Sequence, residues 1–147
     1  MSQNPSSAPA LPVPALNAAD GLGRHLGVKL VDGGDDFAVV ELAIDTRHLN
    51  FLGGCHGGVI FALADSAFGL ASNSLGNLSV AIDAHIAFIK GVKPGDVIRA
   101  EARLVSRSSK TAVYRAEVTR GADVIATFTG TVFVTGKMVA DFVGAGR

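Results

Sequence analysis

The chain has 147 residues and a mass of 15.0 kDa, which suits one domain and leaves no room for a second full core. Apolar residues make up 48% of it and charged residues 18%, so it buries enough surface to fold and is not a disordered protein. Thirteen basic and thirteen acidic residues cancel, which argues against nucleic acid as a partner, and a single cysteine excludes a disulfide framework.

The amino-terminal residues 1–15 hold four of the five prolines and are expected to form a disordered tail. No basic residue precedes Arg24, so this region lacks the positive start of a secretory or transit peptide, and a cytoplasmic protein is expected. A short helix is predicted from Asn17 to Gly27, followed by strands at Val28–Val31 and Phe37–Asp45.

One long helix is predicted from His56 to Asn73, after a loop over Thr46–Cys55. The apolar stretch 57–71 within it carries Asp65 at its centre, so it is too short and too charged to span a membrane. The helix is apolar on every side, unlike a surface helix. We therefore expect the sheet to cover one side and a second subunit to cover the other.

The remainder of the chain alternates apolar and polar residues with a period of two, which predicts strands. The order strand, strand, helix and four strands lacks the crossover helices of a parallel sheet. The sequence thus predicts an α+β fold, a mostly antiparallel curved sheet around one long helix, in one domain of residues 16–137 with a tail of residues 138–147. The later strands are predicted at Ser79–Lys90, Val97–Ser106, Thr111–Arg120 and Val124–Thr135.

Asp65 is the only formally charged residue between Leu49 and Ile82. An unpaired carboxylate in apolar surroundings costs several kcal/mol, so Asp65 has a partner, lies at a wet cleft, or is protonated. Such a group is either a structural anchor that fixes packing or a functional carboxylate.

The glycine-rich segment 53–58, Gly-Gly-Cys-His-Gly-Gly, leads directly into the helix. Glycines let the backbone approach a ligand closely, and the free N–H groups at a helix start favour anions, including the oxyanion of acyl transfer. An ordinary flexible loop is the alternative. The segment is not a dinucleotide fingerprint, because it lacks the required spacing and strand-helix-strand context.

The segment from His48 to Phe68 closely resembles the PaaI-type acyl-CoA thioesterases of the hotdog fold. Their motif is an asparagine, five residues, His-Gly-Gly, and then an aspartate within Leu-Ala-Asp-x-Ala. The resemblance implies a hotdog fold and hydrolysis of acyl-CoA thioesters without a metal or redox cofactor. Phenylacetyl, hydroxyphenylacetyl or medium-chain acyl groups are the expected substrates.

The resemblance also implies roles for individual residues. Asp65 is the general base or nucleophile, the Gly57 N–H polarises the thioester carbonyl, Asn50 lies beside the reacting group, and His56 holds the loop. A serine or threonine often assists the carboxylate, but that position is Ala81 here, so the hydroxyl is missing. The expected contacts with substrate are Gly58, Ala81, Ile82, Asp83 and Phe68, and those with CoA are Arg107, Ser109 and Lys110.

The spacing of Gly57 and Asp65 predicts a dimeric site. Eight residues of helix separate them by about 12 Å, whereas a donor and a base must each lie about 3 Å from one reacting centre. Two antiparallel helices related by a two-fold axis satisfy this requirement. We expect a homodimer, pairing into a homotetramer, with no nucleic-acid or membrane partner.

Two other functions stay open at this point: a hydratase or dehydratase acting on acyl thioesters, and a non-catalytic acyl-CoA-binding module. Several residues have plainer interpretations. Arg107 and Lys110 also fit a charged hairpin tip, and Cys55 fits a small buried apolar residue. Phe61, Phe68 and Phe88 are expected in the core, with one of them free to line an acyl pocket; His25, His48 and His85 are expected as capping or surface groups.

Overall fold

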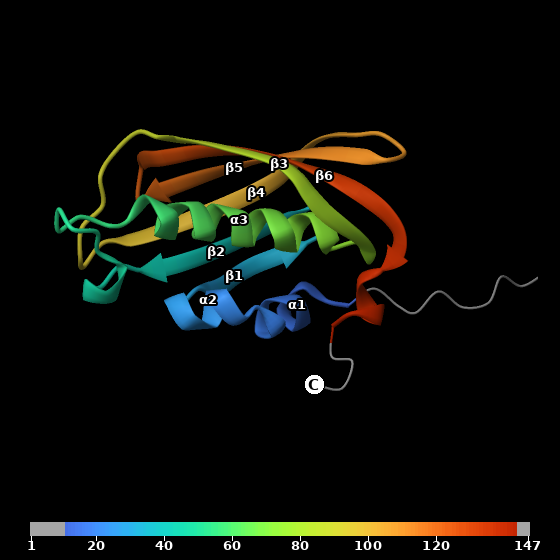
Figure 1. The fold of residues 1–147 in the computed structure, drawn as a ribbon, viewed down its shortest axis with the longest axis horizontal. Coiled ribbons are helices and arrows are strands. Elements are labelled where there is room, and N and C mark those ends of the chain that lie inside the picture. Colours follow the sequence, from blue (N-terminus) through green and yellow to red (C-terminus); the bar gives the residue numbers. More distant parts are fainter. Residues whose placement is uncertain (1–10, 144–147) are drawn as a thin grey trace, which may run out of the picture.

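The computed structural model describes residues 11–143. Figure 1 shows the elements in chain order. The helices are α1 (Val13–Ala19), α2 (Gly21–Leu26) and α3 (Gly57–Asn73). The strands are β1 (Lys29–Gly34), β2 (Phe37–Ala43), β3 (Asn77–Phe88), β4 (Val97–Arg107), β5 (Thr111–Arg120) and β6 (Asp123–Met138). Short 3-10 turns occur at Thr46–His48 and Val139–Asp141.

The six strands form one antiparallel sheet in the order β1-β2-β4-β5-β6-β3. The chain leaves β2 through α3, and β3 pairs with β6 at the far edge, so β1 and β3 are the two edge strands. α3 lies lengthwise along one face of the sheet (Figure 1). This arrangement confirms the predicted antiparallel sheet around one long helix, and α3 begins within one residue of its predicted start.

The core forms where the inward residues of the strands meet α3. Ile98, Ala100 and Ala102 alternate along β4 and are fully buried, as the period of two predicts. Phe68 of α3 packs edge-on against Tyr114, with ring centroids 6.0 Å apart, and against Phe128, 5.4 Å away. These aromatic contacts fix the height of α3 above the sheet.

The amino-terminal region differs from its prediction. α1 begins at Val13, inside the expected tail, and the single expected helix is two helices that meet at Asp20. Val13 and Leu16 are buried in the core, so burial of their side chains overrides the proline-rich composition. α2 ends at Gly27 in the left-handed conformation. Residues 1–10 of the expected tail lie outside the described part of the chain.

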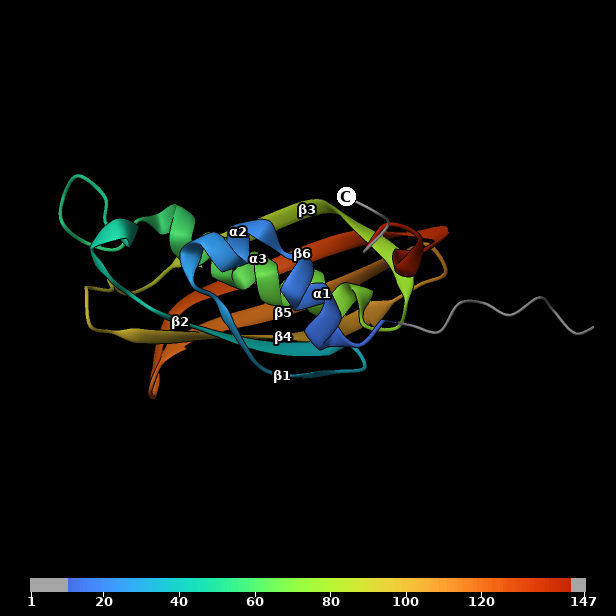
Figure 2. The same ribbon diagram turned by 90° about the horizontal axis from the view of Figure 1, so that it is seen from below.

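α1 and α2 lie against the side of α3 that faces away from β5 and β6, as Figures 1 and 2 show together. The prediction that only a second subunit covers this side is therefore corrected in part, because the chain itself supplies some of the cover. The carboxyl-terminal region also packs on the fold rather than forming a tail from residue 138: Val139 is buried and its N–H donates to the carbonyl of Gly76 at 2.9 Å. Residues 144–147 lie outside the described part.

In residues 11–143, every helix is too short or too polar to cross a membrane.

Candidate active site

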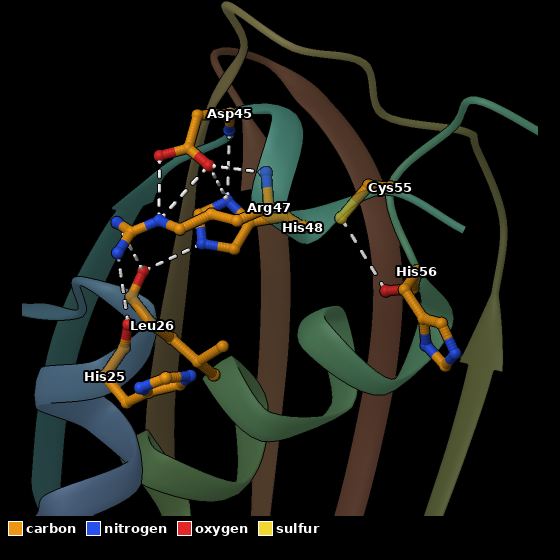
Figure 3. Close-up of polar contacts among 7 residues, drawn as sticks. All are labelled: His25, Leu26, Asp45, Arg47, His48, Cys55 and His56. Atoms are coloured by element: carbon orange, nitrogen blue, oxygen red, sulfur yellow. Dashed lines mark hydrogen bonds and ion pairs between the residues drawn. The ribbon is translucent and has the colours of Figure 1, made fainter. Parts of the chain in front are cut away.

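The chain reaches α3 through a loop that is anchored by one buried histidine. His48 is 1% exposed, and its Nδ1 accepts the backbone N–H of Asp45 at 3.0 Å. Its Nε2 lies 2.8 Å from the carbonyl oxygen of Leu26, so we assign the tautomer that donates from Nε2. Figure 3 shows this group together with Arg47, which bonds the Asp45 carboxylate. His48 was expected as a capping or surface group; it is buried and forms a capping box with Asp45, so the capping alternative is confirmed. Its contact with Leu26 ties the loop to the end of α2.

Asn50 shapes the turn that precedes the glycine-rich segment. Its Oδ1 accepts the backbone N–H groups of Leu52 at 2.9 Å and Gly54 at 3.3 Å. Gly53 has a φ of 83°, a conformation that residues with a side chain rarely adopt. The carboxamide oxygen is thus committed to the loop, while no acceptor within residues 11–143 takes the Nδ2 hydrogens of Asn50. Nδ2 is the part of this side chain that can face a ligand.

The start of α3 carries one backbone donor that stays open. His56 is the N-cap, and its Nδ1 accepts the Gly58 N–H at 2.8 Å, so the imidazole holds the helix start. The Gly57 N–H has no acceptor within the described residues. The Phe88 ring lies over Gly57 so closely that a Cβ there would be 3.2 Å from Cζ. The site therefore combines an unpaired donor with the positive end of a helix dipole.

Asp65 lies two turns further along α3, where its side chain is partly exposed to solvent and partly covered by its neighbours. It forms no ion pair with any residue in the described part of the chain. Partial burial of the carboxyl, and then the negative charge of Asp20, raise the pKa of Asp65 above its ordinary value. Of the three predicted alternatives, the structure favours the wet cleft, because Asp65 and Asp20 line the same cavity between α3 and the amino-terminal helices.

The proximity of Asp20 to Asp65 was not predicted from the sequence. Asp20 is the N-cap of α2 but makes no capping hydrogen bond with its side chain. Its Oδ2 instead accepts a hydrogen bond from Ser66 Oγ at 3.4 Å. Forty-five residues separate Asp20 from Asp65, so no local pattern could have found this pair. Within residues 11–143, no group of three or more His, Cys, Asp or Glu side chains is placed to hold a metal.

The three expected substrate contacts on β3, Ala81, Ile82 and Asp83, lie together on the exposed edge strand. The pairing with β6 skips a residue between Ala81 and Asp83, so Ile82 sits in a β-bulge and is 61% exposed. Bulges are frequent beside active sites because they redirect side chains. The neighbouring expected contact Gly58 is exposed at the start of α3.

Phe68 lies where it was predicted and Phe88 does not. Phe68 is 1% exposed and packs in the core between Tyr114 and Phe128, so its predicted place in the core is confirmed. Its other expected role, as a substrate contact, finds no support in the described residues, because the ring does not line a cavity there. Phe88, expected in the core, is 55% exposed and stacks over Gly57. The apolar residue beside the candidate donor is therefore Phe88, because edge strand β3 leaves its end uncovered.

Arg107 does not stand free to meet a CoA phosphate. Its guanidinium pairs with the Asp36 carboxylate and bonds Tyr114 Oη at 3.2 Å, which joins the end of β4 to the β1–β2 turn. Burial alone would raise the pKa of Asp36, but the hydrogen bonds from Arg107 and Tyr114 lower it below its ordinary value. Ser109 and Lys110 are exposed in the turn between β4 and β5.

The remaining candidates have structural roles or none. Cys55 is 9% exposed, and burial raises the pKa of its thiol, in agreement with a small buried apolar residue. His25 and His85 are exposed. Figure 3 shows the His56 ring at the start of α3, apart from the Asp45, Arg47 and His48 group.

Several known proteins are similar to this chain. Residues 52–127 match the family model described as the thioesterase superfamily. The acyl-coenzyme A thioesterase PaaI of Escherichia coli is 35% identical over 104 residues, covering 71% of this chain and 74% of the relative. The structure of the E. coli PaaI protein from the phenylacetic acid degradation operon superposes with a TM-score of 0.81 at 32% identity, over 84% of this chain and 91% of that one.

Two further solved structures are similar. A point mutant of the phenylacetic acid degradation protein PaaI from Thermus thermophilus is 39% identical, with a TM-score of 0.77, over 79% of this chain and 100% of that one. A Streptococcus mutans protein bound to acetyl CoA is 33% identical, with a TM-score of 0.71, over 75% and 90%. With its antiparallel sheet, its central helix and these matches, the chain belongs to the thioesterase superfamily as a PaaI-type hotdog-fold enzyme that hydrolyses thioesters.

Proposed function

We propose that the protein hydrolyses acyl-CoA thioesters to the free acid and CoA, with Asp65 as the catalytic carboxylate. The observation that carries the proposal is that α3 holds both groups that the reaction needs. The Gly57 N–H has no acceptor, and the Asp65 carboxylate has no cationic partner, within the described residues. An N–H at a helix start stabilises the developing oxyanion, and a nearby carboxylate activates water. The CoA thioester as substrate class is supported by the name of the E. coli relative and by the acetyl CoA in the S. mutans structure.

The site is proposed to form between two protomers. Gly57 and Asp65 are eight residues apart on α3, about 12 Å along its axis, so one helix cannot present both to one carbonyl. Two antiparallel copies of α3 would set Gly57 of one protomer against Asp65 of the partner subunit. Each isologous dimer would then hold two equivalent sites.

Exposed apolar groups near α3 support this assembly. Edge strand β3 presents Val80 and Ile82, which are 49% and 61% exposed, and an uncovered apolar edge strand favours pairing with another strand. In the loop before α3, Phe51 and Leu52 are 96% and 79% exposed. A second copy would bury both surfaces, and we propose that such dimers pair further into a homotetramer.

The proposed reaction begins with the thioester oxygen directed at the Gly57 N–H, with Asn50 Nδ2 as a second donor. Asp65 of the partner subunit takes a proton from water while the water oxygen bonds to the carbonyl carbon. As the tetrahedral intermediate collapses, the carbon–sulfur bond breaks and the proton passes from Asp65 to the departing CoA sulfur. The raised pKa of Asp65 suits this exchange, since a base works best when its pKa is close to the working pH.

A covalent route through the same carboxylate is equally compatible with the geometry. Direct attack by Asp65 would give a mixed anhydride that water then cleaves. A single turnover in ¹⁸O-labelled water detects the covalent route when water attacks the Asp65 carbonyl carbon of the anhydride, because that attack leaves the label in Asp65. In the general-base route the label enters only the product acid. Ala81 supplies no hydroxyl to hold the water in either case.

The acyl group is proposed to be phenylacetyl, hydroxyphenylacetyl or a medium-length chain. The name of the E. coli structure, which places that protein in a phenylacetic acid degradation operon, supports the aryl group for this chain. The cavity beside Asp65 supports an acyl group larger than acetyl.

The test compares the wild type with Asp65→Asn in release of free thiol from phenylacetyl-CoA, hexanoyl-CoA and crotonyl-CoA. We expect Asp65→Asn to lose about 10²–10⁴-fold in kcat, the range for removal of a general base, with an unchanged dimer mass in light scattering. Asp35→Asn, an exposed aspartate in the β1–β2 turn, should keep wild-type turnover. Wild-type turnover in Asp65→Asn would refute the assignment, and hydration of crotonyl-CoA without thiol release would instead favour a hydratase.

A further inference from the structure

A cavity of about 380 Å³ lies between α3 and the segments that precede and follow the central fold. Asp65 lines it, and so do Ser66, Gly69 and Asn73 from the same face of α3. Figure 2 shows α1 and α2 lying across α3 at this place. The apolar walls come from α1, α2, α3, β3 and the carboxyl-terminal turn: Leu16, Leu22, Leu70, Leu78, Val139 and Val143.

The charges in the cavity are all of one sign. Asp20 and Asp65 are the only ionisable residues that line it, and no Lys, Arg or His is among the described lining residues. Ser66 Oγ donates to Asp20, and no cation pairs with either carboxylate in the described part of the chain. An uncharged apolar group is favoured in this space, while a carboxylate would meet two like charges and no compensating cation.

The cavity runs along α3 away from the reacting end. Asp65 and Asn73, both lining residues, are eight residues apart, which is about 12 Å of helix. Its volume falls within the range of small-molecule sites in proteins. A thioester carbonyl placed at Asp65 therefore has room beside it for an acyl group that extends towards Asn73.

We infer that this cavity is the acyl-binding pocket and that it selects uncharged acyl groups, aliphatic or aryl, over acyl groups that end in a carboxylate. The inference rests on the proposed thioesterase function and assigns the acyl specificity to α1, α2 and the carboxyl-terminal turn. The selection has two physical causes. The apolar lining residues stabilise each methylene group that they bury, and the Asp20 charge repels an acyl group that ends in a carboxylate.

Gly69 offers a way to fill the pocket without disturbing the fold. A Cβ built on Gly69 meets no atom within 4 Å, although the residue lies in the middle of α3. A leucine there should project into open space and occupy the pocket one turn beyond Asp65. Gly136 in β6 provides the matched control, because its Cβ is equally free and it does not line the pocket.

The first experiment measures kcat/KM for acetyl-, butyryl-, hexanoyl- and phenylacetyl-CoA. In the wild type we expect kcat/KM to rise by up to about fourfold for each methylene group that the pocket buries. Gly69→Leu should lose at least about tenfold on hexanoyl- and phenylacetyl-CoA while hydrolysis of acetyl-CoA persists. Gly136→Leu should keep the wild-type profile.

The second experiment compares acyl groups of equal length, butyryl-CoA with succinyl-CoA and hexanoyl-CoA with adipoyl-CoA. The wild type should prefer the uncharged member of each pair. Asp20→Asn keeps the shape of the side chain and removes its charge. It should therefore lower the ratio of kcat/KM between the uncharged and the charged substrate by about fivefold, which corresponds to the repulsion between two like charges near a surface.

The outcomes separate this inference from the proposed function. Absence of thiol release from every acyl-CoA would refute the proposed function. Thiol release with an unchanged length profile in Gly69→Leu would refute the pocket alone. Equal use of butyryl- and succinyl-CoA by the wild type, or an unchanged ratio in Asp20→Asn, would refute the charge selection.

Discussion

Replacing Gly130 by alanine should destabilise the protein, because the added methyl group would collide with the Phe68 ring. This ring sets the distance between α3 and the sheet. A Cβ on Gly130 would lie 2.6, 2.7 and 2.8 Å from three carbons of the Phe68 ring, whereas carbon atoms normally approach to about 3.5–4.0 Å. The ring is 1% exposed and held by Tyr114 and Phe128, so it cannot swing away. The ring, and α3 with it, must move by about 1 Å.

Overpacking of this kind costs about 1–3 kcal/mol, from which the lower chain entropy of alanine in the unfolded state returns about 0.5–1 kcal/mol. We therefore expect Gly130→Ala to lower the free energy of unfolding by about 0–2.5 kcal/mol relative to the wild type. Relative to Gly136→Ala, which shares the entropy gain, the loss should be about 1–3 kcal/mol, with Tm lower by several degrees. Urea unfolding followed by circular dichroism measures this change. All variants are compared at one fixed protein concentration, because the dimer that we propose would gain stability with concentration.

Gly136→Ala is the control for Gly130→Ala, since it lies in the same strand and its Cβ meets no atom within 4 Å. It should be as stable as the wild type or slightly more so. Adding Phe68→Leu to Gly130→Ala should recover part of the loss, because the smaller side chain makes room for the methyl group. Equal stability of Gly130→Ala and Gly136→Ala would refute the packing argument. Thiol release by Gly130→Ala should also fall, because Phe68 lies one turn from Asp65 on α3.

Three further predictions concern the site and its support. The kcat/KM should fall as the pH drops through the pKa of Asp65, because Asp65 must be ionised to accept a proton. Burial, and then the Asp20 charge, raise this pKa above 3.8, so the midpoint of a pH profile of kcat/KM should lie above 3.8 and should move down in Asp20→Asn. His56→Ala should cost about 1 kcal/mol of stability through loss of the N-cap, whereas His56→Asn should restore the cap, so activity still missing in His56→Asn would reveal a role of the imidazole in turnover. Arg107→Met should lower the free energy of unfolding by about 1 kcal/mol near neutral pH, through loss of the ion pair with Asp36. Because the pKa of Asp36 is lowered in the fold, the difference in stability between the wild type and Arg107→Met should shrink as the pH falls through that pKa. A difference that stays constant with pH in urea unfolding would contradict the Arg107–Asp36 ion pair.

The residues of the motif that we propose to be catalytic could be located from the sequence because their signals are local. A run of glycines before a long apolar helix, and one carboxylate at its centre, are visible within two dozen residues, and the strands after it follow a period of two. α3, β4 and β5 consequently begin and end within about one residue of their predicted limits. The residues of the motif also carried the family resemblance, which the comparisons confirm.

What surrounds that motif was decided by tertiary packing. The composition of the amino-terminal segment predicted a tail that includes Val13, but the Val13 side chain is buried in the core. The packing of the amino-terminal helices on α3 also places Asp20 near Asp65. Phe68 and Phe88 look alike in sequence, yet one fills the core and the other lies exposed over Gly57, because only the strand order makes β3 an edge. The hydrophobic periodicity of a strand and a short sequence motif are set by residues that are close in the chain, so the sequence alone reveals them. The burial of a side chain and the charges near it are set by segments that meet only when the sheet packs on the helix.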